Sequence, residues 1–70
     1  MSVIREYRKK RKMTQVQLSE RVEASLPTIK RWEAKTHVPT LLQARDICEA
    51  LRLPFTKLYN DYKEETKWVY

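Results

Sequence analysis

The 70-residue chain contains no glycine, a single cysteine and no long apolar run. Without glycine it cannot form a phosphate-binding P-loop, a dinucleotide-binding fingerprint or a G-x-S-x-G nucleophile elbow. One cysteine excludes an intrachain disulfide, and a lone thiol is typical of a reducing compartment. Crossing a bilayer takes a run of roughly 18 apolar residues, and the chain has none. We therefore expect a cytoplasmic protein with no membrane association.

Residues for catalysis or metal binding are equally scarce. The one histidine, His37, and the one cysteine, Cys48, do not match the ligand pattern of a usual zinc site. Cys48 falls in an apolar stripe, where a small core residue is expected in preference to half of a catalytic pair with His37. The sequence thus predicts that the chain is not an enzyme and needs no metal or other cofactor.

Basic residues are concentrated in the first half of the chain. Residues 1–38 hold 10 Lys or Arg against 4 Asp or Glu, whereas residues 39–70 hold 5 of each. The first half therefore carries the whole formal net charge of +6. Such an imbalance favours a face for a polyanion such as nucleic acid, and a merely solubilising surface is the alternative.

Five short helices are expected, each begun by a capping residue or a proline. Ser2, Thr14, Ser25 and Thr40 can act as N-caps, and Thr14 and Thr40 each begin a T-x-x-Q capping box. Pro54 begins the fifth helix. The fourth helix has apolar residues in the three-and-four spacing of a buried stripe: Leu41, Ala44, Ile47, Cys48 and Leu51.

The segment from Thr14 to Glu33 predicts two helices joined by a tight turn at Glu23-Ala24. In the second helix Ile29 and Trp32 lie three apart and should face the core. Several residues are then left for other faces or the exposed tip: Ser25, Leu26, Pro27, Thr28, Lys30 and Arg31. This is the layout of a helix-turn-helix, whose second helix can lie in the DNA major groove.

A basic run, Arg8 to Lys12, closes the first helix. Cations at this end complement the negative end of the helix macrodipole. The same charges also suit contacts to DNA phosphates, so the two interpretations are compatible.

These residues, in this order, resemble a known family over about Ile4 to Leu58. The family is that of the lambda-repressor-like, Cro and XRE-type helix-turn-helix domains. The resemblance is carried by Arg8, Thr14-Gln15, Leu18, Ser25, Thr28-Ile29, Arg31-Trp32-Glu33, Pro39, Leu41 and Ala50-Leu51. It implies a compact all-α domain of five helices that binds double-stranded DNA, commonly as a dimer, and regulates transcription. We expect a repressor of phage or plasmid type; the alternative is a protein-interaction module, such as an antitoxin or adaptor.

The resemblance also implies roles for individual residues. Base contacts are expected from Ser25, Leu26, Pro27, Lys30 and Arg31. Phosphate contacts are expected from Gln15, Thr28, Lys35 and His37, although an inert surface residue is an equally good interpretation of His37. Arg31 suits a bidentate contact to guanine, and the apolar Leu26 and Pro27 suit thymine methyl groups. Arg8 and Glu33 match a pair that forms a salt bridge between the first and third helices.

Four positions depart from the family. It favours glycine where this chain has Lys12, Glu23, Lys35 and Arg52. A left-handed backbone conformation costs a non-glycine residue roughly 1 kcal/mol, so these turns are either strained or of another geometry.

Aromatic residues gather at the C-terminal end. Five of the seven lie in the last sixteen residues, namely Phe55, Tyr59, Tyr62, Trp68 and Tyr70. The chain is therefore divided into a DNA-binding domain, residues 1–59, and an aromatic tail, residues 60–70, which alternates like a short β-hairpin or extended strand. Aromatic enrichment favours a homodimer interface formed by these five residues. The alternative is that the tail covers the core of its own monomer.

Overall fold

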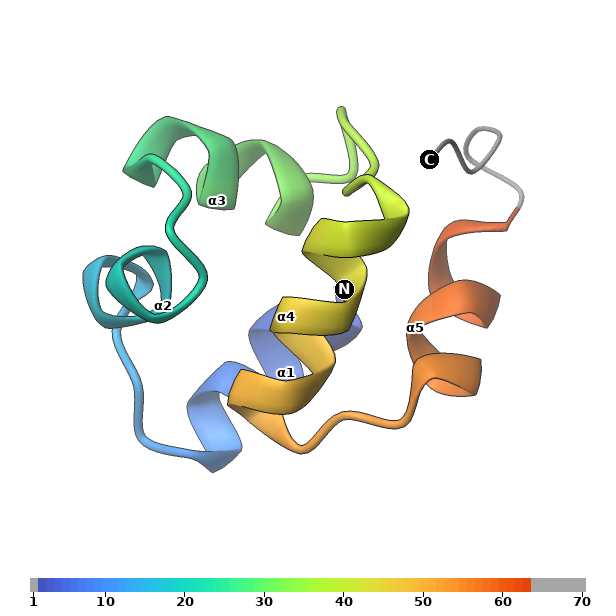
Figure 1. The fold of residues 1–70 in the computed structure, drawn as a ribbon, viewed down its shortest axis with the longest axis horizontal. Coiled ribbons are helices and arrows are strands. Elements are labelled where there is room, and N and C mark those ends of the chain that lie inside the picture. The colour runs from blue at the N-terminus through green and yellow to red at the C-terminus, as the bar shows by residue number, and fades with distance from the viewer. Residues whose placement is uncertain (1, 64–70) are drawn as a thin grey trace.

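A computed structural model describes residues 2–63 and contains five α-helices and no strand over that range. The helices are α1 (Val3–Lys10), α2 (Gln15–Arg21), α3 (Leu26–Glu33), α4 (Leu41–Leu51) and α5 (Phe55–Tyr62) (Figure 1). The expected all-α architecture of five short helices is therefore confirmed. None of these helices has the length and apolarity to cross a membrane.

The helices begin where the capping signals placed them. The hydroxyls of Ser2, Thr14, Ser25 and Thr40 each accept a hydrogen bond from a backbone N–H in the first turn of the following helix. In α2 and α4 the glutamine of the capping box also binds back to the N-cap amide, at 2.8 Å in both cases. The start of α5 follows Pro54 and has no side-chain cap.

The ends of the first four helices share one geometry. Lys12, Glu23, Lys35 and Arg52 all have positive φ angles, between 54° and 61°. The residue after each of them donates its amide to a carbonyl five positions back, at 3.0 to 3.1 Å. This is the closure that usually employs glycine at the left-handed position. The turns at these four positions are therefore glycine-type turns made without glycine.

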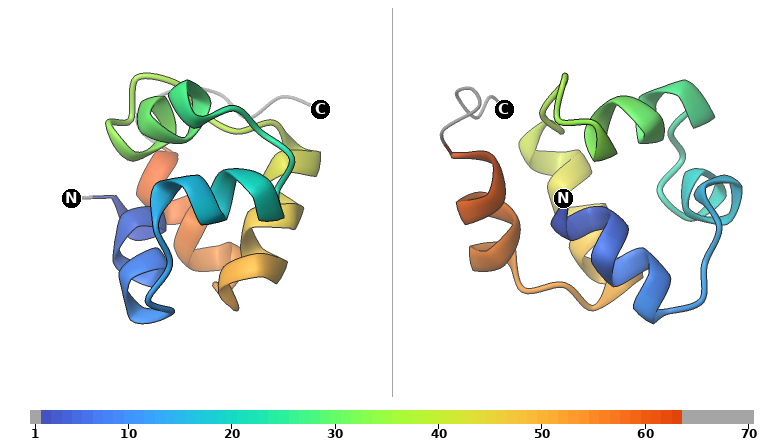
Figure 2. Two further views of the ribbon diagram at one scale, coloured as in Figure 1. Left: turned by 90° about the vertical axis from the view of Figure 1, so that its left-hand side faces the viewer. Right: turned by 180° about the vertical axis from the view of Figure 1, so that it is seen from behind.

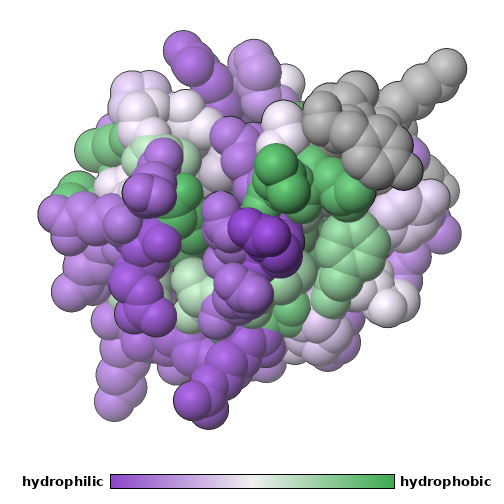
Figure 3. All heavy atoms as spheres, viewed as in Figure 1, coloured by the Kyte–Doolittle hydropathy of each residue, from purple (hydrophilic) through white to green (hydrophobic). Residues whose placement is uncertain are grey.

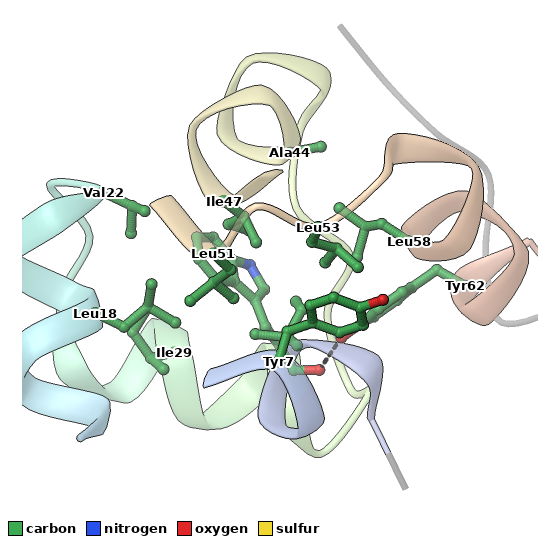
Figure 4. Packing of buried hydrophobic residues seen from close by; sticks show 12 residues of the cluster. Tyr7, Leu18, Val22, Ile29, Ala44, Ile47, Leu51, Leu53, Leu58 and Tyr62 are labelled. Carbon is green, nitrogen blue, oxygen red and sulfur yellow. Dashed lines mark hydrogen bonds between the residues drawn. The ribbon is translucent and has the colours of Figure 1, made fainter. Parts of the chain in front are cut away.

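The core is formed by residues from every helix. Among residues 2–63 twelve hydrophobic residues are buried, including Ile4 of α1, Trp32 of α3 and Tyr62 of α5. Figure 4 shows the other end of this core, where Leu18 and Ile29 of the two neighbouring helices point toward Leu51 of α4. The helix-turn-helix is thus fastened to the rest of the domain through its apolar face.

The arrangement leaves α3 on one side of the molecule. In Figures 1 and 2, α3 lies along the top, and the C-terminal ends of α1 and α4 lie at the bottom. Helix α1 packs against α3, α4 and α5, whereas α2 packs mainly against α3. The outer face of α3 is therefore available to a ligand.

Two expectations need revision, and a third concerns residues that the structure does not describe. The boundary expected after residue 59 falls inside α5, which continues to Tyr62 because Tyr62 is fully buried in the core. Leu41 and Cys48 of the α4 stripe are only half-buried, since they lie at the edge of α4 that faces solvent beside α5. The hairpin or extended strand expected in the tail, with Trp68 and Tyr70, lies outside the described residues.

The left-handed turns lead to a first prediction. Glu23→Gly removes a Cβ from a φ of 54° and should stabilise the domain by up to about 0.5 kcal/mol, after the extra backbone entropy of glycine is subtracted. In a domain of this size that is a rise in Tm of up to about 2–4 °C, measured by thermal circular dichroism. Glu49→Gly, at an exposed helical position in α4, is the matched control and should lose about 1 kcal/mol. A fall in Tm for both variants would contradict the strain at Glu23.

Candidate nucleic-acid interface

The helix-turn-helix is built from α2, α3 and the turn between them. The two helices cross steeply, since Figure 1 shows α2 nearly end-on while α3 runs across the view. Leu18 and Ile29 are completely buried between them, and Val22 at the end of α2 is nearly so. The left-handed residue Glu23 lets the chain reverse within a few residues. The apolar contacts therefore hold α3 at a fixed angle to α2.

A buried polar network ties α3 to both preceding helices. Nε of Arg8 lies 2.7 Å from Oε2 of Glu33, and its Nη2 donates to Oε1 at 3.1 Å. The remaining Nη1 of Arg8 donates to the carbonyl of Met13 at 2.8 Å, and Gln15 Nε2 donates to Glu33 Oε1 at 3.2 Å. The side chains of Arg8 and Glu33 are only 10% and 6% exposed. Arg8 and Glu33 thus form the salt bridge that the resemblance implied, and Gln15 braces α3.

The outer surface of α3 carries the residues expected to contact bases. Ser25, Pro27, Lys30 and Arg31 are exposed, and Leu26 is half-buried. Within residues 2–63 neither Lys30 nor Arg31 takes part in a salt bridge. Two long cations and a small apolar tip therefore share the outer face of α3.

The expected phosphate contacts fall into two groups. Gln15 lies at the first position of α2, and Thr28 is half-buried with its hydroxyl 2.8 Å from that of Ser25. His37 is exposed in the loop after α3, with Nδ1 3.3 Å from the hydroxyl of Thr36. Lys35 differs, because its Nζ is held 2.8 Å from Oδ1 of Asp61 in α5. A Lys35 contact to phosphate would require this ion pair to open, so we assign Lys35 a bracing role.

Helix α5 contacts α3 at a second point. The hydroxyl of Tyr62 donates to the backbone carbonyl of Trp32, and the Tyr62 side chain is fully buried (Figure 4). Tyr62 therefore belongs to the core of its own monomer, which corrects its expected place in a dimer interface. Phe55 and Tyr59 lie elsewhere on α5. They are 44% and 42% exposed, and their rings stack with centroids 6.3 Å apart.

Two residues near the site were missed in the sequence. Asp61 binds Lys35 and also accepts the amide of Val3 at 2.9 Å, so that it links α5 to the start of α1 and the end of α3. No local pattern marks this residue, because its partners are 58 and 26 positions away. Arg5 lines a hollow of about 440 Å³ with Gln15 and Glu33. Its spacing from Arg8, one helical turn, was a usable signal.

The basic run at the end of α1 is divided. Arg8 is buried in its salt bridge, while the four residues after it are exposed. They lie at the lower end of α1 in Figures 1 and 2, away from α3. A phosphate contact by this run at the same DNA site as α3 is therefore not supported, because the length of α1 separates them.

An apolar area lies beside α5. Leu41, Cys48 and Phe55 line a hollow of about 420 Å³ together with Arg45 and Glu49. Figure 3 shows apolar side chains gathered between α4 and α5 on the face toward the viewer.

Burial raises the pKa of the Cys48 thiol, which keeps it protonated at neutral pH. Within residues 2–63 no group of His, Cys, Asp and Glu is placed to hold a metal ion.

Two short helices joined by a tight turn, with the outer face of the second helix exposed, define the class of helix-turn-helix domains. A family model described as helix-turn-helix matches residues 4–58, and the chain belongs to this family of Cro, XRE and lambda-repressor-like proteins. The family indicates a DNA-binding transcription regulator. No curated protein and no solved structure shows a significant match to the chain.

Proposed function

We propose that the chain is a sequence-specific regulator of transcription, a repressor of phage or plasmid type acting in the cytoplasm. The observation that carries this proposal is the position of Lys30 and Arg31. They project from an exposed helix that Arg8, Glu33 and Gln15 hold in place. A protein that only binds other proteins has no need for two such cations, which form no salt bridge within residues 2–63, whereas DNA phosphates and guanine edges attract them.

The contacts divide by type. Gln15 at the start of α2, Thr28 in α3 and His37 in the loop after α3 are proposed to bind phosphates, which would set the register of the domain. Base contacts are assigned to α3 itself, from Ser25 at its N-cap to Arg31 in its last turn. Leu26 and Pro27 cannot donate a side-chain hydrogen bond to a base, so they would pack on thymine methyl groups.

A homodimer is proposed, formed through the exposed aromatic residues of α5. Phe55 and Tyr59 present a stacked, partly exposed pair, and the apolar hollow beside α4 continues this surface. Trp68 and Tyr70 remain proposed members of the interface. Symmetry would place two recognition helices about one DNA turn apart, roughly 34 Å.

Selection of binding sites from random duplex DNA tests both the sequence-specific binding and the homodimer. We expect an inverted repeat whose half-sites are centred about 10 base pairs apart and contain guanine and thymine. Binding to the selected site should weaken steeply with salt, since phosphate contacts release counterions. If the selected DNA contains a single half-site that is not repeated, the homodimer is contradicted. If the selection yields no consensus sequence, sequence-specific binding is contradicted.

The second candidate function is a protein-interaction module, such as an antitoxin or adaptor. The apolar hollow lined by Leu41, Cys48 and Phe55 favours it, because such a surface fits a protein partner better than DNA. This function becomes the better one if the selection yields no DNA sequence.

A further inference from the structure

Five cations lie together at the end of the molecule opposite α3. Lys10, Arg11 and Lys12 come from the end of α1, Arg52 ends α4, and Lys57 belongs to the first turn of α5. All five are exposed. Figures 1 and 2 show these three helix ends at the bottom, and Figure 3 shows a hydrophilic lower edge. We call these five residues the basic pole.

Specific contacts hold the basic pole together. The Nζ atoms of Lys10 and Lys57 lie 4.5 and 5.6 Å from the centroid of the Tyr7 ring. Lys57 also donates to the Tyr7 hydroxyl at 3.1 Å. Arg11 Nε donates to the carbonyl of Leu51 at 2.9 Å, which brings α1 beside Arg52. These cations are therefore positioned on the surface by aromatic and backbone partners.

Helix dipoles explain only part of this arrangement. Cations at the ends of α1 and α4 complement the negative ends of those helices. Lys57 is the third residue of α5 and stands at the positive end, where a carboxylate would be favoured. The hydrogen bond with Tyr7 raises the pKa of Lys57, and Glu6 adds to the rise. Lys57 is therefore a cation at a position where the helix dipole of α5 disfavours positive charge.

The charge of the basic pole is not neutralised by ion pairs within residues 2–63. The salt bridges there join Arg8 to Glu33, Lys35 to Asp61 and Arg45 to Asp46. Protein interfaces are depleted in lysine and use apolar or aromatic anchors. Three lysines and two arginines without such an anchor fit a backbone of phosphates better than a protein surface.

We propose that the basic pole binds the phosphate backbone of a second DNA duplex, so that one molecule bridges two DNA segments. Backbone binding at the basic pole stands by itself, whereas bridging rests on the proposed binding of DNA by α3. The two faces lie at opposite ends of the molecule, so the two duplexes need not collide. Once α3 occupies its site, any DNA looped back onto the protein would be present at a high effective concentration.

The test uses a basic-pole variant, in which Lys10, Lys12, Arg52 and Lys57 are replaced by glutamine. Arg11 is kept because it binds the α4 backbone. The control is Lys63→Gln, which removes an exposed cation that belongs to neither the basic pole nor α3. A recognition-face variant, Lys30→Gln with Arg31→Gln, isolates binding by the basic pole, and circular dichroism checks that every variant folds.

Two measurements are made on these proteins. The first is affinity for a random 20-base-pair duplex as a function of KCl. In the recognition-face background, the basic-pole substitutions should reduce the salt slope by up to about 3.6, from four phosphates at roughly 0.9 each. The second measures bridging. The protein is bound to a duplex that is fixed to beads, and the amount of a second, labelled duplex that the beads then retain is measured. The basic-pole variant should capture at least about tenfold less, while the control captures as the parent does.

An unchanged salt slope would overturn the proposal. Unchanged capture would also overturn it, because a dimer would then be bridging through its two α3 helices. Tighter binding of polyglutamate or of anionic lipid vesicles than of duplex would assign the basic pole to an acidic protein or a membrane. A failure of the proposed function gives a different result from a failure of the basic-pole proposal. In that case the parent protein binds selected and random DNA with equal affinity.

Discussion

Glu33→Ala is expected to destabilise the domain by roughly 3–5 kcal/mol, because it leaves the guanidinium of Arg8 buried without a counter-charge. Glu33 accepts two hydrogen bonds from Arg8 and one from Gln15, and its side chain is only 6% exposed. Small domains have little stability to lose, typically near the lower end of about 5–15 kcal/mol. The variant should therefore be largely unfolded at physiological temperature. Urea denaturation followed by circular dichroism measures the loss.

A matched control for Glu33→Ala is Asp46→Ala. Asp46 also pairs with an arginine, Arg45, but at 3.3 Å and with side chains 40% and 64% exposed. Solvent screens this pair, so its removal should change stability by less than about 1 kcal/mol. Equal effects of Asp46→Ala and Glu33→Ala would contradict the importance of burial at the Arg8–Glu33 pair.

A double replacement separates charge from packing. Arg8→Met with Glu33→Leu removes both charges and fills much of the same space, and such swaps are often close to neutral in stability. The same swap removes the partner of Gln15, so α2 would lose its hydrogen bond to α3. We therefore expect near-parental stability with weaker DNA binding. A large loss of stability in the double variant would show that the pair also contributes packing that Met and Leu cannot supply.

The helices were predictable because their signals are local. Hydroxyl residues and T-x-x-Q boxes stand within three residues of the amides that they cap, so residue spacing alone placed the starts of four helices. The resemblance predicted where the four turns lie, but it did not predict their left-handed backbone conformation. Non-glycine residues could have closed these helices differently, and only the structure shows that they adopt positive φ.

The roles of α5 residues were not separable in the sequence. Phe55 and Tyr59 are four apart, and so are Leu58 and Tyr62, so helical periodicity defines two faces without saying which is buried. The structure turns Leu58 and Tyr62 inward because Tyr62 reaches the Trp32 carbonyl, thirty residues earlier. Lys35 and Asp61 are a similar case. A contact between residues far apart in sequence depends on the packing of whole helices, which no local pattern encodes.

Arg31→Ala is expected to weaken binding to the selected operator by roughly 5- to 150-fold, the equivalent of 1–3 kcal/mol for a bidentate guanine contact. Arg31 is exposed in the last turn of α3, and its backbone carbonyl accepts the amide of Thr36 at 3.1 Å. Alanine keeps this backbone bond, so the fold should be preserved. Fluorescence anisotropy on operator and random duplexes measures both affinities.

Random DNA is the reference that gives the Arg31 result its meaning. Loss of one cation should weaken random binding only slightly and lower the salt slope by about 1 at most. Arg31→Lys keeps the charge but not the planar fork, so it should resemble alanine on the operator and the parent on random DNA. Lys63→Ala removes an exposed charge that lies outside α3 and should leave operator binding unchanged. Equal losses of affinity for operator and random DNA would show that Arg31 contacts a phosphate. The contact to guanine would then be assigned to Lys30.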